Sequence, residues 1–321
     1  MFGRFLPNMA AIGAVLLLSV VAPSAALADK RVALVVGNAA YQNVAPLKNP
    51  AADARAMAQL FRDAGFDFVD LKTDVANAEL RRALREFTLQ ANQADIAVIY
   101  FSGHGLQLYG TNYLVPVDAH LASDLDIDDE AVALDRLVSS ADGAKRVRLV
   151  ILDACRQSSL AAAMRLDRRE AKLGAAQSGG LGVSEPARRD TLIAYAAKAG
   201  TASVEGDGAH SIYTAALLKS LIVPGLDLRL ALGRIRDDVM KATAKQDEPF
   251  VYGAVYAEDT ALMPASAAAQ EKLEDVKTDF DLVDKIGTAM AYSVFLKTHP
   301  AGDYAERARA KVKELTKDPT R

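Results

Sequence analysis

Two stretches of the sequence decide the fold: Ile96–Gly105 (IAVIYFSGHG) and Leu149–Arg156 (LVILDACR). Each begins as a short apolar run rich in β-branched residues, which is typical of a buried strand. Each run then ends on a reactive side chain, His104 in the first stretch and Cys155 in the second. Because ligands of parallel sheets bind beyond the carboxyl ends of the strands, the pattern predicts that both side chains lie at one functional edge.

The sequence on either side of these two stretches alternates between strand and helix patterns up to about residue 264. An alternation of this kind predicts an α/β fold with a mostly parallel sheet and helices on both faces. The expected strands cover 31–36, 66–71, 95–101, 147–152, 191–196 and a last one from 249, with a hairpin over 106–115. The expected helices cover about 50–64, 77–91, 130–140, 211–221 and 228–242.

Residues 265–321 differ in character, because they read as helical throughout with one break at 299–302. The segments 289–296 and 304–310 resemble one tetratricopeptide-like helical hairpin, which suggests a protein partner for this part of the chain. Such repeats normally need about three units to be stable, so a helical tail packed on the main domain is the alternative. The expected domains are a signal peptide (1–28), an α/β domain (29–264) and this C-terminal segment.

The composition is that of an ordinary globular protein of 321 residues, with 51% hydrophobic and 25% charged residues. A formal net charge of −3 argues against a general nucleic-acid binder, which would be basic. A nucleotide-binding α/β domain is also disfavoured. The first strand is followed by Gly37-Asn38-Ala39-Ala40, which is not a G-x-G-x-x-G turn, and there is no P-loop.

Residues 1–28 have the pattern of a secretory signal peptide: Arg4, an apolar stretch over Met9–Ala22, and Ala26-Leu27-Ala28 before Asp29. The apolar stretch is short for a membrane span, so we expect export to the periplasm or the medium without a stable anchor. An uncleaved anchor is the alternative. The chain has a single Cys, and a lone thiol in an oxidising compartment is a liability unless it is used. This favours Cys155 as a nucleophile.

The spacing of the two motifs points to a family. His104 precedes Cys155 by 51 positions, and a Cys in an Ala-Cys-Arg context with a His about 50 residues upstream is typical of caspases. Over roughly residues 31–256 the chain resembles the caspase-like cysteine peptidases, on the metacaspase and paracaspase side that includes the bacterial orthocaspases. Either motif alone is equally consistent with a buried thiol or a turn histidine.

The resemblance implies a caspase-like sheet and a cysteine endopeptidase. It assigns Cys155 as the nucleophile, His104 as the general base and acid, and the backbone N–H groups of Gly105 and Cys155 as the oxyanion hole. We attribute the glycines on either side of His104 to a turn that lets the substrate backbone approach closely. No cofactor is implied.

The same resemblance implies specificity for a basic side chain. Caspases proper have Gln two places before the Cys, whereas metacaspases and paracaspases have Asp, as this chain does at Asp153. They have a second Asp in the segment that matches Leu47–Asp53. Asp53 and Asp153 are thus expected to line an acidic pocket, and buried carboxylates require a cation, so we expect protein or peptide substrates with Arg or Lys before the scissile bond. Glu205 is a further candidate, and a solvated helix-face position is the alternative for Asp53.

Residues 157–190 form a long segment without a steady period, which in caspase-like relatives is the linker between the large and small subunits. An enzyme that prefers Arg or Lys carries its own substrate here, which predicts self-cleavage. The alternative is a basic, solvated loop that is not cut. The candidate sites are Arg165, Arg168, Arg169 and Lys172.

Three further expectations complete the hypothesis. The acidic loop around Asp118–Asp129 lacks the Gly and the closing Glu of an EF-hand, so we expect a solvated loop and no metal, although some metacaspases use calcium. His120, His210 and His299 are expected to be loop or surface residues without a catalytic partner. After Arg156 the chain reads Gln157-Ser158-Ser159, where many bacterial relatives have a turn with Asn and Pro. Because this turn lies beside the nucleophile, a catalytically weak or inactive caspase-like scaffold that binds proteins is the alternative function.

Overall fold

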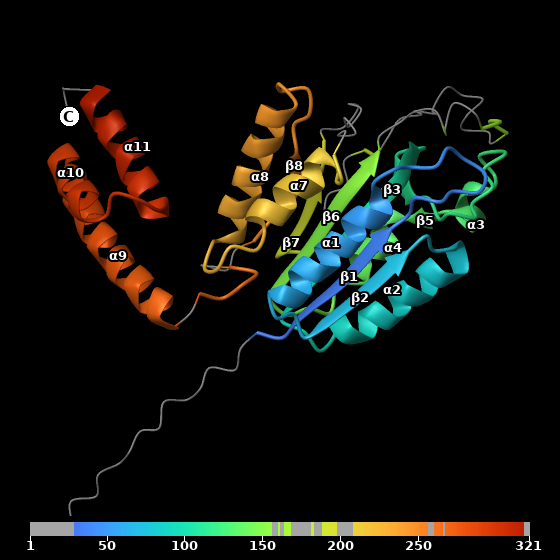
Figure 1. Cartoon of the computed structure of the whole chain (residues 1–321), viewed down its shortest axis with the longest axis horizontal. Coiled ribbons are helices and arrows are strands. Elements are labelled where there is room, and N and C mark those ends of the chain that lie inside the picture. The colour runs from blue at the N-terminus through green and yellow to red at the C-terminus, as the bar shows by residue number, and fades with distance from the viewer. Residues whose placement is uncertain are drawn as a thin grey trace, which may run out of the picture.

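Figure 1 shows a computed structural model of the chain. The structure describes residues 29–155, 160, 164–167, 181–182, 188–197, 208–255, 260–265 and 267–317, with Cys155 described by its backbone. The expected signal peptide (1–28) lies outside the described residues, as do Arg168, Arg169, Lys172 and Glu205.

A mostly parallel sheet forms the centre of the protein, in the order β2-β1-β3-β6-β7-β8. The pairs β1–β2, β1–β3, β3–β6 and β6–β7 are parallel, and β8 runs antiparallel to β7. The predicted fold class is therefore confirmed. The strands are β1 (Arg31–Gly37), β2 (Phe68–Thr73), β3 (Ile96–Leu108), β6 (Val147–Cys155), β7 (Thr191–Tyr195) and β8 (Phe250–Ala254).

Helices cover both faces of this sheet, because the central strands are apolar on both sides. Alternate residues such as Val35 and Val36 in β1 belong to opposite hydrophobic cores. One core packs against α1 (Pro50–Asp63), α7 (Ile212–Ser220) and α8 (Leu228–Ala242). The other packs against α2 (Asn77–Ala91) and α4 (Leu134–Ser139).

Strand β3 is longer than predicted, and the expected Gly-His-Gly turn is wrong. The strand runs without a break through His104 to Leu108. Two partners support the extension, because β6 continues beside it to Cys155 and residues 105–108 pair antiparallel with β4 (Thr111–Leu114). The turn comes later, at Tyr109 and Gly110, both with positive φ.

The predicted helix over 130–140 is interrupted. It consists of α3 (Ile127–Glu130), the short strand β5 (Val132–Ala133) and α4. Ala131 is extended, with φ −115° and ψ 172°, and Val132 then pairs with Leu114 of β4. Sheet pairing with a distant strand therefore overrides a local helical pattern.

The C-terminal segment holds three helices within the described residues: α9 (Ala267–Ile286), α10 (Ala289–Thr298) and α11 (Asp303–Lys317). They share a small core of Phe280, Tyr292, Phe295 and Ala308, and Figure 1 shows them beyond α8, on the far side from β2. The expected pair corresponds to α10 and α11, and the break at Gly287 was not predicted. Within the described part of the chain, no helix is both long enough and apolar enough to cross a membrane.

Candidate active site

The register between β3 and β6 makes His104 and Cys155 direct neighbours. The two strands pair in parallel without a slip from Ile96 opposite Val147 to His104 opposite Cys155. Cys155 is the last residue of β6, and His104 lies opposite it where the parallel pairing of β3 with β6 ends. Open α/β sheets bind ligands at this edge. The backbone thus brings together the two residues on which the sequence hypothesis depends.

A hydrogen bond fixes the tautomer of the His104 imidazole. The ring is buried, with 6% of the residue exposed, and its Nε2 lies 2.8 Å from the carbonyl oxygen of Ala45. A carbonyl oxygen only accepts, so Nε2 carries the proton and donates it. In the neutral ring Nδ1 is then the basic nitrogen, the one that can accept a proton.

Asp153 lies two residues before Cys155 on β6 and is almost buried, with 8% exposed. Its Oδ2 accepts hydrogen bonds from Thr214 Oγ1 at 2.8 Å, from Tyr100 at 3.4 Å and from Ser211 Oγ. Burial raises the pKa of this carboxyl, and the three hydroxyl donors partly oppose the rise. Among the described residues no hydrogen-bond donor reaches Oδ1.

Asp53, in the first turn of α1, is fully buried, so the solvated alternative is wrong. Its Oδ1 accepts a hydrogen bond from His210 Nδ1 at 2.8 Å, and Ser211 N lies 3.3–3.4 Å from both carboxylate oxygens. Burial raises the pKa of Asp53 to about 6, and the nearby charge of Asp153 adds to the rise. The structure therefore brings Asp53 and Asp153 together as a buried acidic pair.

Sequence reasoning missed the residues that join this pair. His210, expected to have no partner, is bonded to Asp53 with 29% of its side chain exposed. Ser211 contacts both carboxyls, since its N–H points to Asp53 and its hydroxyl donates to Asp153. Ser211 is also the N-cap of α7 and accepts from Thr214 N at 2.9 Å. Two features of the sequence pointed here without assigning a role: a serine before a helix, and the resemblance of Ser211-Ile212-Tyr213 to the substrate-wall segment of bacterial relatives.

Gly105, the residue after His104, packs against Leu181 of the 157–190 segment. A Cβ on Gly105 would lie 2.9 Å from the Leu181 side chain, so this glycine makes room for a residue of the 157–190 segment.

Arg165, one of the candidate cleavage sites, lies within the described residues. Its backbone bonds to Ala122 and Asp124, and its side chain, 72% exposed, pairs with Asp167 at 2.6 Å.

The acidic loop is less solvated than predicted, because its carboxylates serve as acceptors within the protein. Asp124 is fully buried and accepts from Tyr109 and from Asp167 N. Asp118 accepts from Asn77 N at 2.8 Å, and Asp126 from Ser123 N at 2.7 Å. In the described ranges, no group of three or more His, Cys, Asp or Glu residues is arranged to hold a metal ion.

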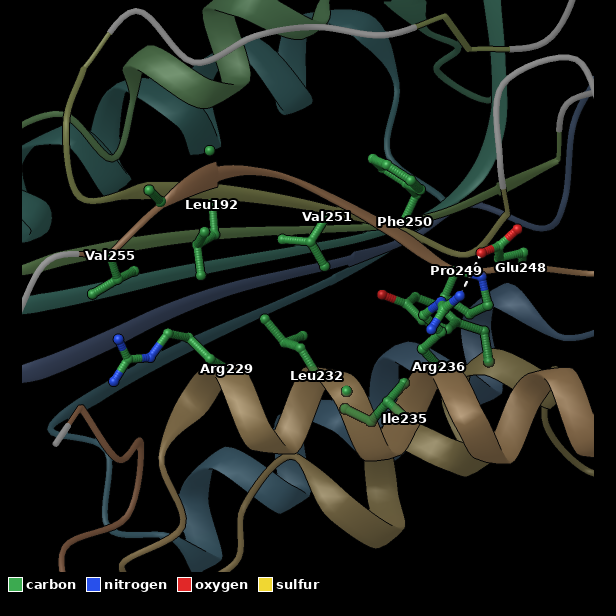
Figure 2. Close-up of a pocket in the computed structure, with 14 residues that line it drawn as sticks. Leu192, Arg229, Leu232, Ile235, Arg236, Glu248, Pro249, Phe250, Val251 and Val255 are labelled. Carbon is green, nitrogen blue, oxygen red and sulfur yellow. Dashed lines mark hydrogen bonds and ion pairs between the residues drawn. The ribbon is translucent and has the colours of Figure 1, made fainter. Parts of the chain in front are cut away.

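A separate apolar groove of about 440 Å³ lies between α8 and β8. Figure 2 shows Leu232 and Ile235 of α8 facing Leu192 of β7 and Val251 of β8, with the Arg236–Glu248 ion pair (2.6 Å) at one end. Neither His104 nor the acidic pair lines it, so the groove is distinct from the candidate site.

Comparison with known proteins agrees with this geometry. A family model described as "Caspase domain" matches residues 30–259. The human mucosa-associated lymphoid tissue lymphoma translocation protein 1 is 37% identical over 93 residues, and its mouse homolog is 36% identical over 93 residues. Each match covers 29% of this chain and 11% of the relative's length. This chain therefore belongs to the caspase-domain family, and residues 30–259 are its caspase-fold peptidase domain.

Proposed function

We propose that this chain is a cysteine endopeptidase that cleaves after Arg or Lys with a Cys155–His104 dyad. The pairing of His104 opposite Cys155, with Nε2 already bonded to Ala45, is the observation that supports it. Nδ1 would take the thiol proton, and the thiolate would attack the scissile carbonyl carbon. The N–H groups of Gly105 and Cys155 would stabilise the oxyanion.

The remaining steps follow from the same two residues and need no cofactor or metal. The imidazolium of His104 returns its proton to the leaving amine as the peptide C–N bond breaks, which leaves an acyl group on sulfur. Water then loses a proton to His104, attacks the thioester and releases the acid and the thiol. A positional scan of fluorogenic peptides, with and without calcium, tests both the reaction and its specificity.

The acidic pair is proposed to recognise the basic side chain. Asp153 Oδ2 is filled by three hydroxyls while Oδ1 has no donor among the described residues, which suits the forked donors of a guanidinium. Two buried carboxylates repel each other, so a cation between them is favoured. Glu205 is proposed as a third acidic residue of this pocket.

The pKa of Asp53 predicts that ligand binding depends on pH. Its value of about 6 lies above the ordinary 3.8, and the pKa of Asp153 is raised as well, so acid removes negative charge from the pocket. One unit below its pKa, Asp53 is about tenfold less ionised. We expect acetyl-arginine amide to bind a Cys155→Ala protein about tenfold more weakly at pH 5 than at pH 7.5.

Calorimetry on the Cys155→Ala protein measures the affinity for the ligand separately from the pH dependence of the chemical step. Asp53→Asn in the same background is the control, and we expect it to bind weakly with less dependence on pH. An affinity that stays constant from pH 7.5 to pH 5 would contradict the role of Asp53.

Self-cleavage is proposed for the linker. Two described points anchor it: Met164 is buried beside the Arg165 backbone bonds, and Gly182 exchanges hydrogen bonds of 2.6 and 2.9 Å with Asn112. A cut at Arg168, Arg169 or Lys172 would leave an anchor on each fragment, whereas a cut at Arg165 requires its paired backbone to open first. We expect two fragments that stay associated.

Intact-mass analysis of the wild type beside Cys155→Ala tests this expectation. Cleavage in the wild type alone is the predicted result. Cleavage in both proteins would indicate a contaminating protease, and cleavage in neither would favour a single-chain enzyme.

Residues 1–28 are proposed to direct export.

The C-terminal helices are proposed to bind a protein partner. Four large apolar side chains on α9 and α10 are 55–79% exposed, which is typical of a contact surface. The same surface would serve the alternative function, an inactive caspase-fold scaffold. The four residues are Leu282, Ile286, Met290 and Val294.

A further inference from the structure

The segment between β1 and α1 contacts His104 at two points. Ala45 accepts the Nε2 hydrogen bond, and Tyr41, four residues earlier, packs against the imidazole. Asp74 holds the start of this segment, since its Oδ1 accepts from Ala39 N at 2.7 Å and from Ala40 N at 2.8 Å. Both contacts with His104 therefore come from one tethered loop.

Tyr41 contacts both the ring and the backbone of His104. The two ring centroids are 4.5 Å apart with an interplanar angle of 52°. The Tyr41 hydroxyl accepts a hydrogen bond from His104 N at 2.7 Å and donates one to the Val115 carbonyl at 3.1 Å. Tyr41 is 7% exposed, so these bonds form away from bulk water, where losing one is costly.

The glycine before His104 is explained by this contact. A Cβ on Gly103 would lie 2.6 Å from the Tyr41 hydroxyl oxygen, closer than two such atoms can approach. The sequence hypothesis attributes this glycine to the approach of substrate. The structure gives it a different task, which is to let the tyrosine reach the His104 backbone.

We propose that Tyr41 is a positioning residue that sets the orientation of the His104 imidazole, an inference that rests on the proposed cysteine peptidase function. The Ala45 carbonyl fixes one atom of the ring, and that bond alone would leave the ring able to tilt about it. The Tyr41 ring limits that tilt, and its hydroxyl holds the backbone from which the imidazole projects. Together they hold the imidazole in one orientation beside Cys155, which the proposed proton transfer requires.

Two variants separate the hydroxyl from the ring. Tyr41→Phe keeps the ring and removes the bond to His104 N, and Tyr41→Leu removes the stacking as well. Because small misplacements of a catalytic group slow chemistry without weakening binding, we expect kcat to fall about tenfold in the first and about a hundredfold in the second, with KM unchanged. Tyr252→Phe, a partly buried tyrosine on β8, is the matched control and should leave both constants unchanged.

Imidazole NMR on Cys155→Ala protein with labelled histidine provides a readout that needs no catalysis. We expect the His104 ring to be an Nε2–H tautomer, and Tyr41→Phe to change its tautomer ratio and its titration midpoint. If the ring signals change but even the wild type cleaves no peptide, the proposed function fails while the positioning role stands. Unchanged ring signals, or a KM that rises in step with a falling melting temperature, would overturn the proposal.

Discussion

Replacing Cys155 with alanine is expected to lower peptide cleavage at least about a thousandfold while the protein stays folded. The thiolate is the only nucleophile in the proposed reaction, and nothing beside His104 on β6 replaces it. His104→Ala should lose a similar factor, since residues that act as one unit are not additive. The double variant should be no worse than either single variant.

His299→Ala is the matched control for the imidazole. This histidine bonds to Asp279 at 2.9 Å in the C-terminal helices, far along the chain from the dyad. Rates with a fluorogenic Arg peptide and melting curves should be recorded for the wild type and all four variants. A folded Cys155→Ala protein that keeps more than a few per cent of the wild-type activity would contradict the mechanism.

Asp153→Asn is expected to reduce cleavage after Arg by about 1.5–3 kcal/mol, the value of a charged hydrogen bond, or about 10- to 150-fold. The amide keeps an acceptor oxygen for Ser211, Thr214 and Tyr100, so the walls of the pocket should stay in place. What it removes is the charge. Cleavage after an uncharged residue, where measurable, should change little.

The matched control is Asp238→Asn, which removes an equal charge from α8, where the partly exposed Asp238 pairs with Lys219 of α7 at 2.7 Å. The kcat/KM values for Arg and for citrulline peptides give the specificity directly. A wild-type enzyme that prefers Asp before the cut, or a variant with unaltered Arg cleavage, would show that the acidic pair does not bind the substrate.

The sequence predicted the parts of the site that depend on strand ends. An apolar run of known length places its last residue at the sheet edge, so the pattern of residues alone was enough to bring His104 and Cys155 together. This inference needed only the period of a strand and the rule that parallel strands end at one edge. Asp153 lies on the same strand, but its expected role in the pocket came from the resemblance to metacaspases and paracaspases.

The parts that it could not predict depend on loops and on pairing between distant segments. Ala45, Tyr41 and His210 lie outside the helices and strands, and their contacts involve partners 59, 63 and 157 positions away. No local pattern encodes such contacts. The same reason explains the interrupted helix at residues 127–139, where pairing between Val132 and Leu114 decides the local structure.

The buried acidic pair also affects the stability of the folded protein, and through it the lifetime of each molecule. Because the pKa of Asp53 is raised to about 6 in the fold, the folded state binds this proton more tightly than the unfolded chain does, and stability falls as pH rises through that range. At neutral pH the ionised carboxylate of Asp53 therefore lowers the free energy of unfolding of the ligand-free protein. A basic peptide bound as proposed would offset this loss and stabilise the fold by mass action. The lifetime of each molecule would then depend on substrate supply: working enzyme resists unfolding and degradation, and idle enzyme is cleared first.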